Sequence, residues 1–141
     1  MKVDYGVRAL IHLAQHYGDG PVQASELAAS QAIPEPYWDQ VLTTLHKFGL
    51  IRSRRGPQGG HALAKGPTEI DLNMIMVTLD GTSAPLSCMD EPTECTLFSS
   101  CAQREVWHSV EKSVHSVLSS TTIADLVARQ LQLTVGGTYQ I

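Results

Sequence analysis

Residues 36–63 read PYWDQVLTTLHKFGLIRSRRGPQGGHAL, and this stretch decides the fold. Its first part repeats apolar residues at helical spacing, which predicts a helix from about Pro36 to Phe48 with Gly49 as its C-terminal cap. Two short apolar pairs then flank a basic, glycine-rich segment. This arrangement predicts a β-hairpin with a long tip.

Two further helices are predicted upstream of this stretch. Apolar residues recur at helical spacing over residues 4–17, and a second, short helix follows with Ser25 as its expected N-cap. Three helices followed by a hairpin form the pattern of a winged helix-turn-helix. We therefore expect a mainly α fold with a small β-hairpin wing, and a DNA-binding domain over residues 1–67.

The rest of the chain divides into three parts. Residues 68–100 are expected to form a connecting helix, capped at Thr68–Asp71, and a cysteine-bearing loop. Residues 101–132 are expected to form a long helix and a short C-terminal helix, the latter opened by a capping box at Thr122–Asp125. We expect residues 133–141 to be a loosely ordered tail.

The predicted long helix, from about Cys101 to Ser119, has an apolar seam. The seam follows a 3-4-3 spacing and consists of Trp107, Val110, Val114 and Val117. In a small protein such a seam needs a partner to cover it, so we expect a homodimer joined by a long dimerisation helix.

The charge is unevenly distributed along the chain. The net charge is −4, but residues 1–67 carry seven basic and five acidic residues, and residues 68–141 carry three basic and nine acidic residues. Five of the basic residues, and no acidic one, lie between Lys47 and Lys65. A local basic patch of this kind favours a nucleic-acid partner more than the overall charge opposes one.

The third predicted helix carries candidate base contacts near its N-terminus: Pro36, Tyr37, Asp39 and Gln40. A glutamine can pair with adenine, an aspartate can accept from the cytosine amino group, and Lys47 would lie nearer a phosphate. Alone, these residues fit an ordinary exposed helix equally well.

The hairpin tip adds Arg52, Arg54 and Arg55, followed by Gly59 and Gly60. Arginine suits a narrow minor groove, and glycine allows close approach to phosphates. A solvated basic turn is the simpler alternative, and a phosphate-binding P-loop is excluded by the residue order.

Cys88, Cys95 and Cys101 stand in a C-x6-C-x5-C pattern. Thiolates suit an iron–sulfur cluster or zinc, and the close spacing of zinc fingers is absent. Three unrelated thiols remain the alternative.

No apolar run reaches the length of a membrane span, and the first residues do not resemble a signal peptide, so we expect a cytoplasmic protein without membrane contact. No arrangement of a nucleophile and a base indicates an enzyme.

Together these features resemble the Rrf2 family of bacterial winged-helix regulators. The matching segments are residues 4–10, 36–51 and 54–61, the three cysteines, and residues 121–126. The resemblance implies a homodimer on a two-fold-symmetric DNA operator, with Asp39 and Gln40 reading bases and Arg55 entering the minor groove. It also implies that the cysteines hold an iron–sulfur cluster, 4Fe-4S or alternatively 2Fe-2S, near the dimer interface.

The fourth cluster ligand is left open by the sequence. Some family members carry a histidine three residues after the last cysteine, where this chain has Arg104. Others use an aspartate of the partner subunit's first helix, and Asp4 stands at that place. His12 is a further candidate. The resemblance thus predicts a regulator that senses redox, iron or nitric oxide; the alternative is a cluster-free regulator responding through thiol oxidation or a protein partner.

Overall fold

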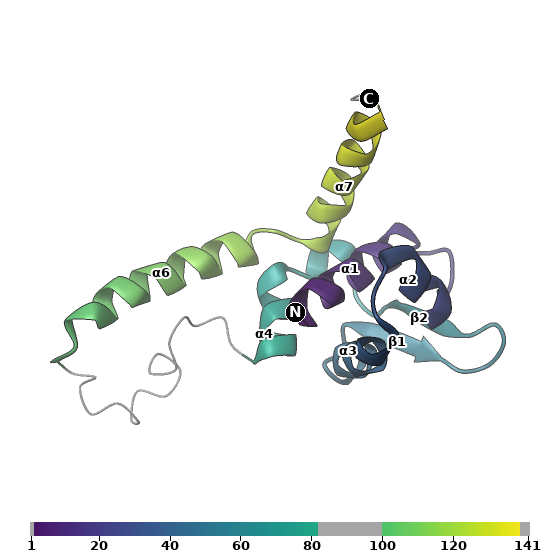
Figure 1. The fold of residues 1–141 in the computed structure, drawn as a ribbon, viewed down its shortest axis with the longest axis horizontal. Helices are drawn as coiled ribbons and strands as arrows, with labels where there is room; N and C mark the ends of the chain where they lie inside the picture. Colours follow the sequence, from purple (N-terminus) through teal and green to yellow (C-terminus); the bar gives the residue numbers. More distant parts are fainter. Residues whose placement is uncertain (1, 82–99, 139–141) are drawn as a thin grey trace.

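The computed structural model describes residues 2–81 and 100–138 (Figure 1). The elements are α1 (Lys2–Gln15), α2 (Ala24–Gln31), α3 (Glu35–Lys47), β1 (Ile51–Arg54), β2 (Gly60–Leu63), the 3-10 helix η1 (Pro67–Glu69), α4 (Leu72–Asp80), α6 (Ala102–Ser119) and α7 (Ile123–Thr138). The predicted fold class, a mainly α winged helix followed by a long helix, is confirmed.

A buried apolar cluster joins α1, α2, α3, the hairpin and α4. Leu10, Leu45 and Ile75 are each completely buried in it. Burial of a side chain of this size contributes about 1.5–3 kcal/mol, so these contacts dominate the stability of the fold. Ile70 and Ile123 belong to the same cluster, so the segments after residue 67 pack directly on the winged helix.

Gly49 lies at the junction of α3 and β1 and ends α3, as predicted from the sequence. Gly49 has φ +78°, a left-handed conformation that favours glycine. It lets the Leu50 amide donate to the Leu45 carbonyl at 3.0 Å, which closes the end of α3. The chain can therefore turn at once from the helix into the wing.

The wing is an antiparallel pair with Ile51 opposite Leu63 and Arg54 opposite Gly60. It is also paired on its other side, because the amides of Val22 and His61 each donate to the other residue's carbonyl, at 2.8 and 2.7 Å. The segment before α2 thus fixes the base of the wing to the helical core.

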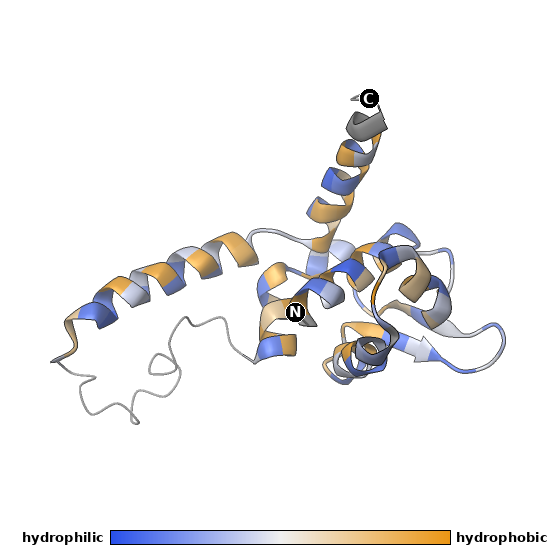
Figure 2. Cartoon of the chain, in the orientation of Figure 1, coloured by the Kyte–Doolittle hydropathy of each residue, from blue (hydrophilic) through white to orange (hydrophobic). Residues whose placement is uncertain are grey.

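Helix α6 extends away from the core (Figure 1) and contains no buried residue. Its apolar residues alternate with polar ones along the helix (Figure 2). No helix in the described ranges is long and apolar enough to cross a bilayer.

Three predicted boundaries are wrong. Ser25 lies inside α2, whose N-cap is Gln23. Thr68 lies in η1, and the residue that caps α4 is Asp71, which accepts from the Met74 amide at 2.9 Å because its own backbone is extended. The expected loose tail is helical through Thr138, although Gly136 and Gly137 lie within its last turn.

The predicted capping box of α7 is confirmed. The Thr122 hydroxyl accepts from the Asp125 amide at 3.1 Å, and the Thr122 amide donates to the Asp125 carboxylate at 2.9 Å. Thr122→Ala should lower the free energy of unfolding by about 1 kcal/mol, because one amide loses its partner. Urea denaturation measures the loss. Ser109→Ala, which removes an exposed mid-helix hydroxyl of α6, is the control and should change stability little.

Candidate nucleic-acid interface

One face of α3 is buried and the other is exposed. Trp38, Val41, Leu42 and Leu45 form the buried face. The exposed residues include the predicted contacts Pro36, Asp39, Gln40 and Lys47. Because the apolar stripe holds the helix against the core, the polar side chains are presented outward along its whole length.

Tyr37 is partly held by α1 rather than fully free on the surface. Its ring lies 5.8 Å from that of Tyr5, and the Arg8 guanidinium lies 5.9 Å from the Tyr5 ring. Arg8 also pairs with Asp4 at 3.0 Å and donates to the Gln31 carbonyl at 3.3 Å. Arg8 thus ties α1 to the end of α2, a role that the sequence pattern did not reveal.

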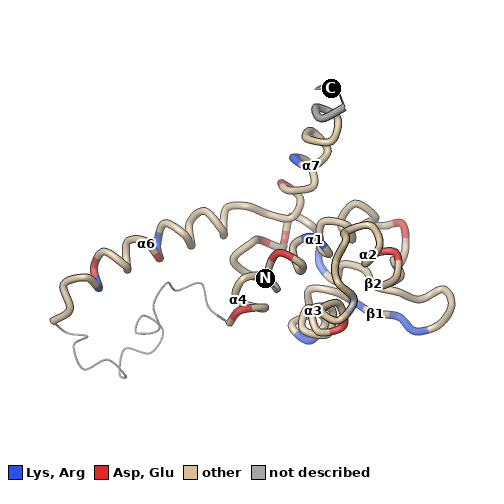
Figure 3. Tube along the Cα trace, viewed as in Figure 1, with Lys and Arg blue, Asp and Glu red and all other residues tan. Residues whose placement is uncertain are grey.

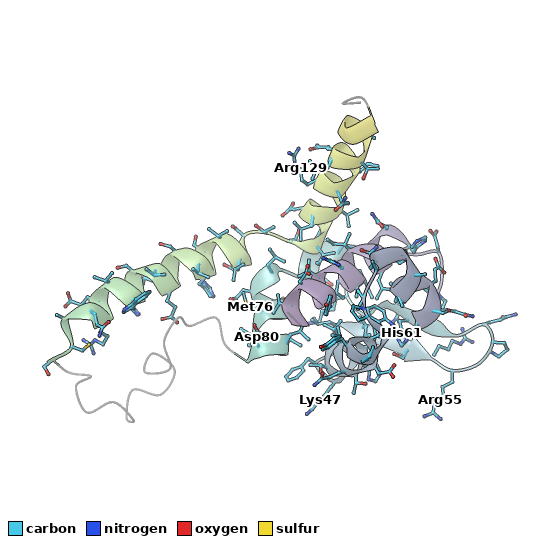
Figure 4. All side chains as sticks on the ribbon, viewed as in Figure 1. Lys47, Arg55, His61, Met76, Asp80 and Arg129 are labelled. Carbon is cyan, nitrogen blue, oxygen red and sulfur yellow. The ribbon has the colours of Figure 1, made fainter. Side chains whose placement is uncertain are left out.

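Arg52 and Arg54 lie in strand β1 and not in the tip, where the sequence placed them, and of the three arginines only Arg55 is in the turn. The wing is exposed from Arg52 through Gln58. Within the described part of the chain, Arg52, Arg54 and Arg55 have no acidic partner. Figure 3 shows this basic segment projecting beyond the core. In Figure 4 Arg55 of the wing and Lys47 of α3 extend from the same side of the molecule.

Gly59 and Gly60 are required by the wing's own backbone. A Cβ atom on Gly59 would overlap the Arg54 carbonyl group. One on Gly60 would lie 2.5 Å from the Val22 carbonyl oxygen, and Gly60 has φ +145°. Close packing within the protein accounts for both glycines; their approach to DNA stays a prediction.

His61 is a half-buried residue of β2. Its Nδ1 lies 2.8 Å from the Ser53 hydroxyl on the opposite strand. Burial lowers the pKa of His61, and the nearby His46 lowers it further. The neutral imidazole therefore packs in the hairpin as an uncharged ring at neutral pH.

Of the three cysteines, Cys88 and Cys95 lie outside the described residues. Cys101 is the half-buried N-cap of α6, and its thiol makes no capping hydrogen bond. A helix N-terminus stabilises a thiolate, which is the ligand form of cysteine. Within one chain Cys101 and the start of α1, which carries Asp4, lie far apart (Figure 1).

His12, the other candidate ligand, lies between α1 and α2 and is only 7 % exposed. Burial lowers its pKa, the neighbouring His16 adds to this, and Glu26 opposes it. Its ring faces Ser30 and Glu26 of α2. The structure describes no contact between His12 and Cys101.

Comparison with known proteins decides the family. The Rrf2 profile, described as an iron-dependent transcriptional regulator, matches residues 1–129. The chain belongs to the Rrf2 family. It is 32 % identical over 127 residues to the HTH-type transcriptional regulator CymR of Bacillus subtilis, covering 90 % of this chain and 87 % of CymR. It is 30 % identical over 129 residues to IscR of Yersinia pestis, covering 92 % and 78 %.

Solved structures of Rrf2-family relatives have the same fold. The structure titled as CymR, the global cysteine regulator of B. subtilis, matches with a TM-score of 0.77 and 31 % identity, covering 92 % of this chain and 95 % of that one. The T. potens IscR structure matches with a TM-score of 0.71 and 36 % identity, covering 92 % and 85 %. The chain is thus an Rrf2-family transcriptional regulator and not an enzyme.

Proposed function

We propose that this cytoplasmic Rrf2 protein binds duplex DNA as a homodimer, with α3 in the major groove and the wing in the adjacent minor groove. The observation that carries the proposal is that the exposed face of α3 and the basic wing project from one side of the core. On that side Gln40 and Asp39 can read base edges, Lys47 can contact a phosphate, and Arg55 can enter the minor groove.

The dimer part of the proposal rests on α6. Val106, Val110 and Val117 are 64 %, 38 % and 64 % exposed on an 18-residue helix without buried residues. A second copy of α6 would cover this surface with identical residues, as two-fold symmetry requires. The two α3 helices would then meet a two-fold-symmetric operator with half-sites about 34 Å apart.

The sensing part of the proposal assigns Cys88, Cys95 and Cys101, with Asp4 of the partner subunit, to an iron–sulfur cluster. The described donors fit such a group, because the Cys101 thiol makes no capping hydrogen bond and the Asp4 carboxylate, although it pairs with Arg8 at 3.0 Å, is exposed. A 4Fe-4S cluster is favoured, and a 2Fe-2S cluster or His12 as a ligand is the alternative. When bound, the cluster supplies iron that reacts with oxygen or nitric oxide.

This chain offers a direct mechanical link from Cys101 to the DNA-binding face. Cys101 opens α6, α6 contacts α4, and α4 packs against both α1 and α3. A group bound to Cys101 would therefore change the angle of α6. In the proposed dimer this would change the distance between the two α3 helices. DNA binding tolerates little change in that spacing.

The similarity to CymR favours a second candidate. CymR of B. subtilis is described as a global cysteine regulator, and it is among the relatives that match nearly the whole chain. In this alternative the same winged helix responds without a cluster, through oxidation of its thiols or through a protein partner.

Purification without oxygen, followed by iron, sulfide and visible-absorption measurements, distinguishes the two candidates. We expect bound iron and sulfide in the wild type, their loss in Cys101→Ser, and a less stable cluster in Asp4→Ala. Asp19→Ala, an exposed acid in the loop after α1, is the matched control and should bind the cluster normally. A wild-type protein without iron and sulfide would establish the cluster-free candidate instead.

Arg55→Ala should weaken binding to a duplex selected from a random pool by the wild-type protein. A lost minor-groove arginine lowers affinity by about 1–3 kcal/mol, or about 5- to 150-fold. Anisotropy titration at fixed salt measures the change. Arg129→Ala, on α7 at the opposite side of the core from Arg55 (Figure 4), removes the same charge and should bind as the wild type does. Equal losses in the two variants would mean that only the overall charge matters.

A further inference from the structure

The C-terminal end of α1 carries two histidines, His12 in its last turn and His16 just beyond it, and Glu26 of α2 lies beside them. The proposed function uses only His12, and only as an alternative cluster ligand. His12 and His16 are one helical turn apart, with ring centroids separated by 4.7 Å. Glu26 of α2 faces them, and its Oε1 lies 3.7 Å from His12 Nε2. One donor atom from each of the three residues lies within 4.8 Å of the others.

His12 is the fixed member of this group. Only 7 % of the residue is exposed, and its buried Nε2 has no hydrogen-bond partner among the described residues. A buried polar atom without a partner is unfavourable, so this nitrogen is a position where a ligand would stabilise the protein.

The other ring nitrogen of His12 is held by α2. Nδ1 of His12 lies 3.2 Å from the Ser30 hydroxyl and 3.4 Å from the side-chain amide nitrogen of Gln31. When Nδ1 carries the proton and donates it to Ser30, the lone pair is on Nε2, the nitrogen nearer Glu26, where a metal ion can bind it. Metal-bound histidines generally donate their second nitrogen in this way, which orients the ring.

We propose that His12, His16 and Glu26 bind one divalent transition-metal ion of the Zn²⁺ class. Two imidazoles and a carboxylate form a donor set that Zn²⁺ accepts, with water in the fourth position. A tetrahedral site needs donor atoms about 3.3 Å apart. His16 is half-buried and the Glu26 side chain is 56 % exposed, so both can rotate toward the fixed His12.

The proposed ion would join α1 to α2. Helix α2 leads through a short turn into α3, so the ion would brace the support of the recognition helix. The site needs none of the cysteines. It is therefore independent of a cluster that uses Asp4 as its fourth ligand, and it can be tested in a chain that holds no cluster.

The test uses the full chain with Cys88, Cys95 and Cys101 replaced by serine, so that no thiol competes for the probe. After treatment with a chelator, Zn²⁺ is titrated by calorimetry, and the unfolding temperature is followed with and without Zn²⁺. We expect one ion per chain and a higher unfolding temperature with Zn²⁺. Glu26→Gln and His16→Ala should each weaken binding by at least about tenfold. Circular dichroism confirms that both variants fold.

His108→Ala combined with Glu111→Gln is the matched control, because this pair lies 3.8 Å apart on α6 and also consists of a histidine and an acid. It should leave the affinity unchanged. In the same cysteine-free chain, Co²⁺ should perturb the imidazole resonances of His12 and His16 before those of His108. Absence of Zn²⁺ binding, or equal affinity in Glu26→Gln and the parent, would overturn the proposal.

Discussion

A Trp38→Ala variant should lose about 3–5 kcal/mol of unfolding free energy. Trp38 is 3 % exposed and lies on the buried face of α3, within the apolar cluster. Its removal leaves a cavity beneath the proposed recognition helix. Because domains of this size are stable by only about 5–15 kcal/mol, the loss should also weaken DNA binding at moderate temperature.

Trp38→Phe is the control that separates ring packing from the indole nitrogen. Nε1 of Trp38 is buried without a hydrogen-bond partner in the described parts of the chain. Phenylalanine removes this unpaired donor and keeps most of the apolar contact, so we expect a loss of about 1.5 kcal/mol or less. Urea denaturation followed by circular dichroism measures both variants. If Trp38→Phe and Trp38→Ala lost the same free energy of unfolding, the packing of an aromatic ring at this position would not be what stabilises α3.

A Gly60→Ala variant should show the second largest effect, a destabilisation of about 3 kcal/mol together with weaker DNA binding. The added Cβ would lie 2.5 Å from the Val22 carbonyl oxygen, at a residue with φ +145°. Relief of that clash requires the wing to separate from Val22, which breaks the two backbone hydrogen bonds between Val22 and His61. The arginines of the wing would then lose their fixed position beside α3.

Gly56→Ala provides the comparison for this variant. Gly56 also has a positive φ, of +107°, but no atom lies within 4 Å of the position of its added Cβ. It should therefore show only the backbone strain, about 1 kcal/mol. The difference between the two variants measures the clash with Val22. If Gly60→Ala and Gly56→Ala lost similar amounts of stability and of DNA affinity, the close contact between Gly60 and Val22 would not have the role proposed for it.

The features predicted well from the sequence are those determined locally. Gly49 and the Thr122–Asp125 capping box depend on residues at most a few positions apart, and both were predicted correctly. The exposed face of α3 also follows from local spacing, since the apolar stripe determines which side is buried.

The features that were missed depend on contacts between distant residues. Val22 pairs with His61 across 39 positions, and no local pattern marks Val22 as a strand residue. The glycines of the wing were interpreted as a means of approaching DNA, while the backbone of Val22 and Arg54 supplies a sufficient reason for them. The contact between His12 and Glu26 was not predicted, because nothing in the sequence places Glu26 next to His12.

The central claim is that the state of the cysteine site controls DNA binding. It is tested most directly by measuring, without oxygen, the affinity of one preparation for its selected duplex before and after the iron is removed by a chelator. We expect iron removal to change the affinity of the wild-type protein for the duplex by about 5- to 150-fold. The same treatment should leave the affinity of Cys101→Ser unchanged. The same affinity before and after iron removal in the wild-type protein would contradict the central claim.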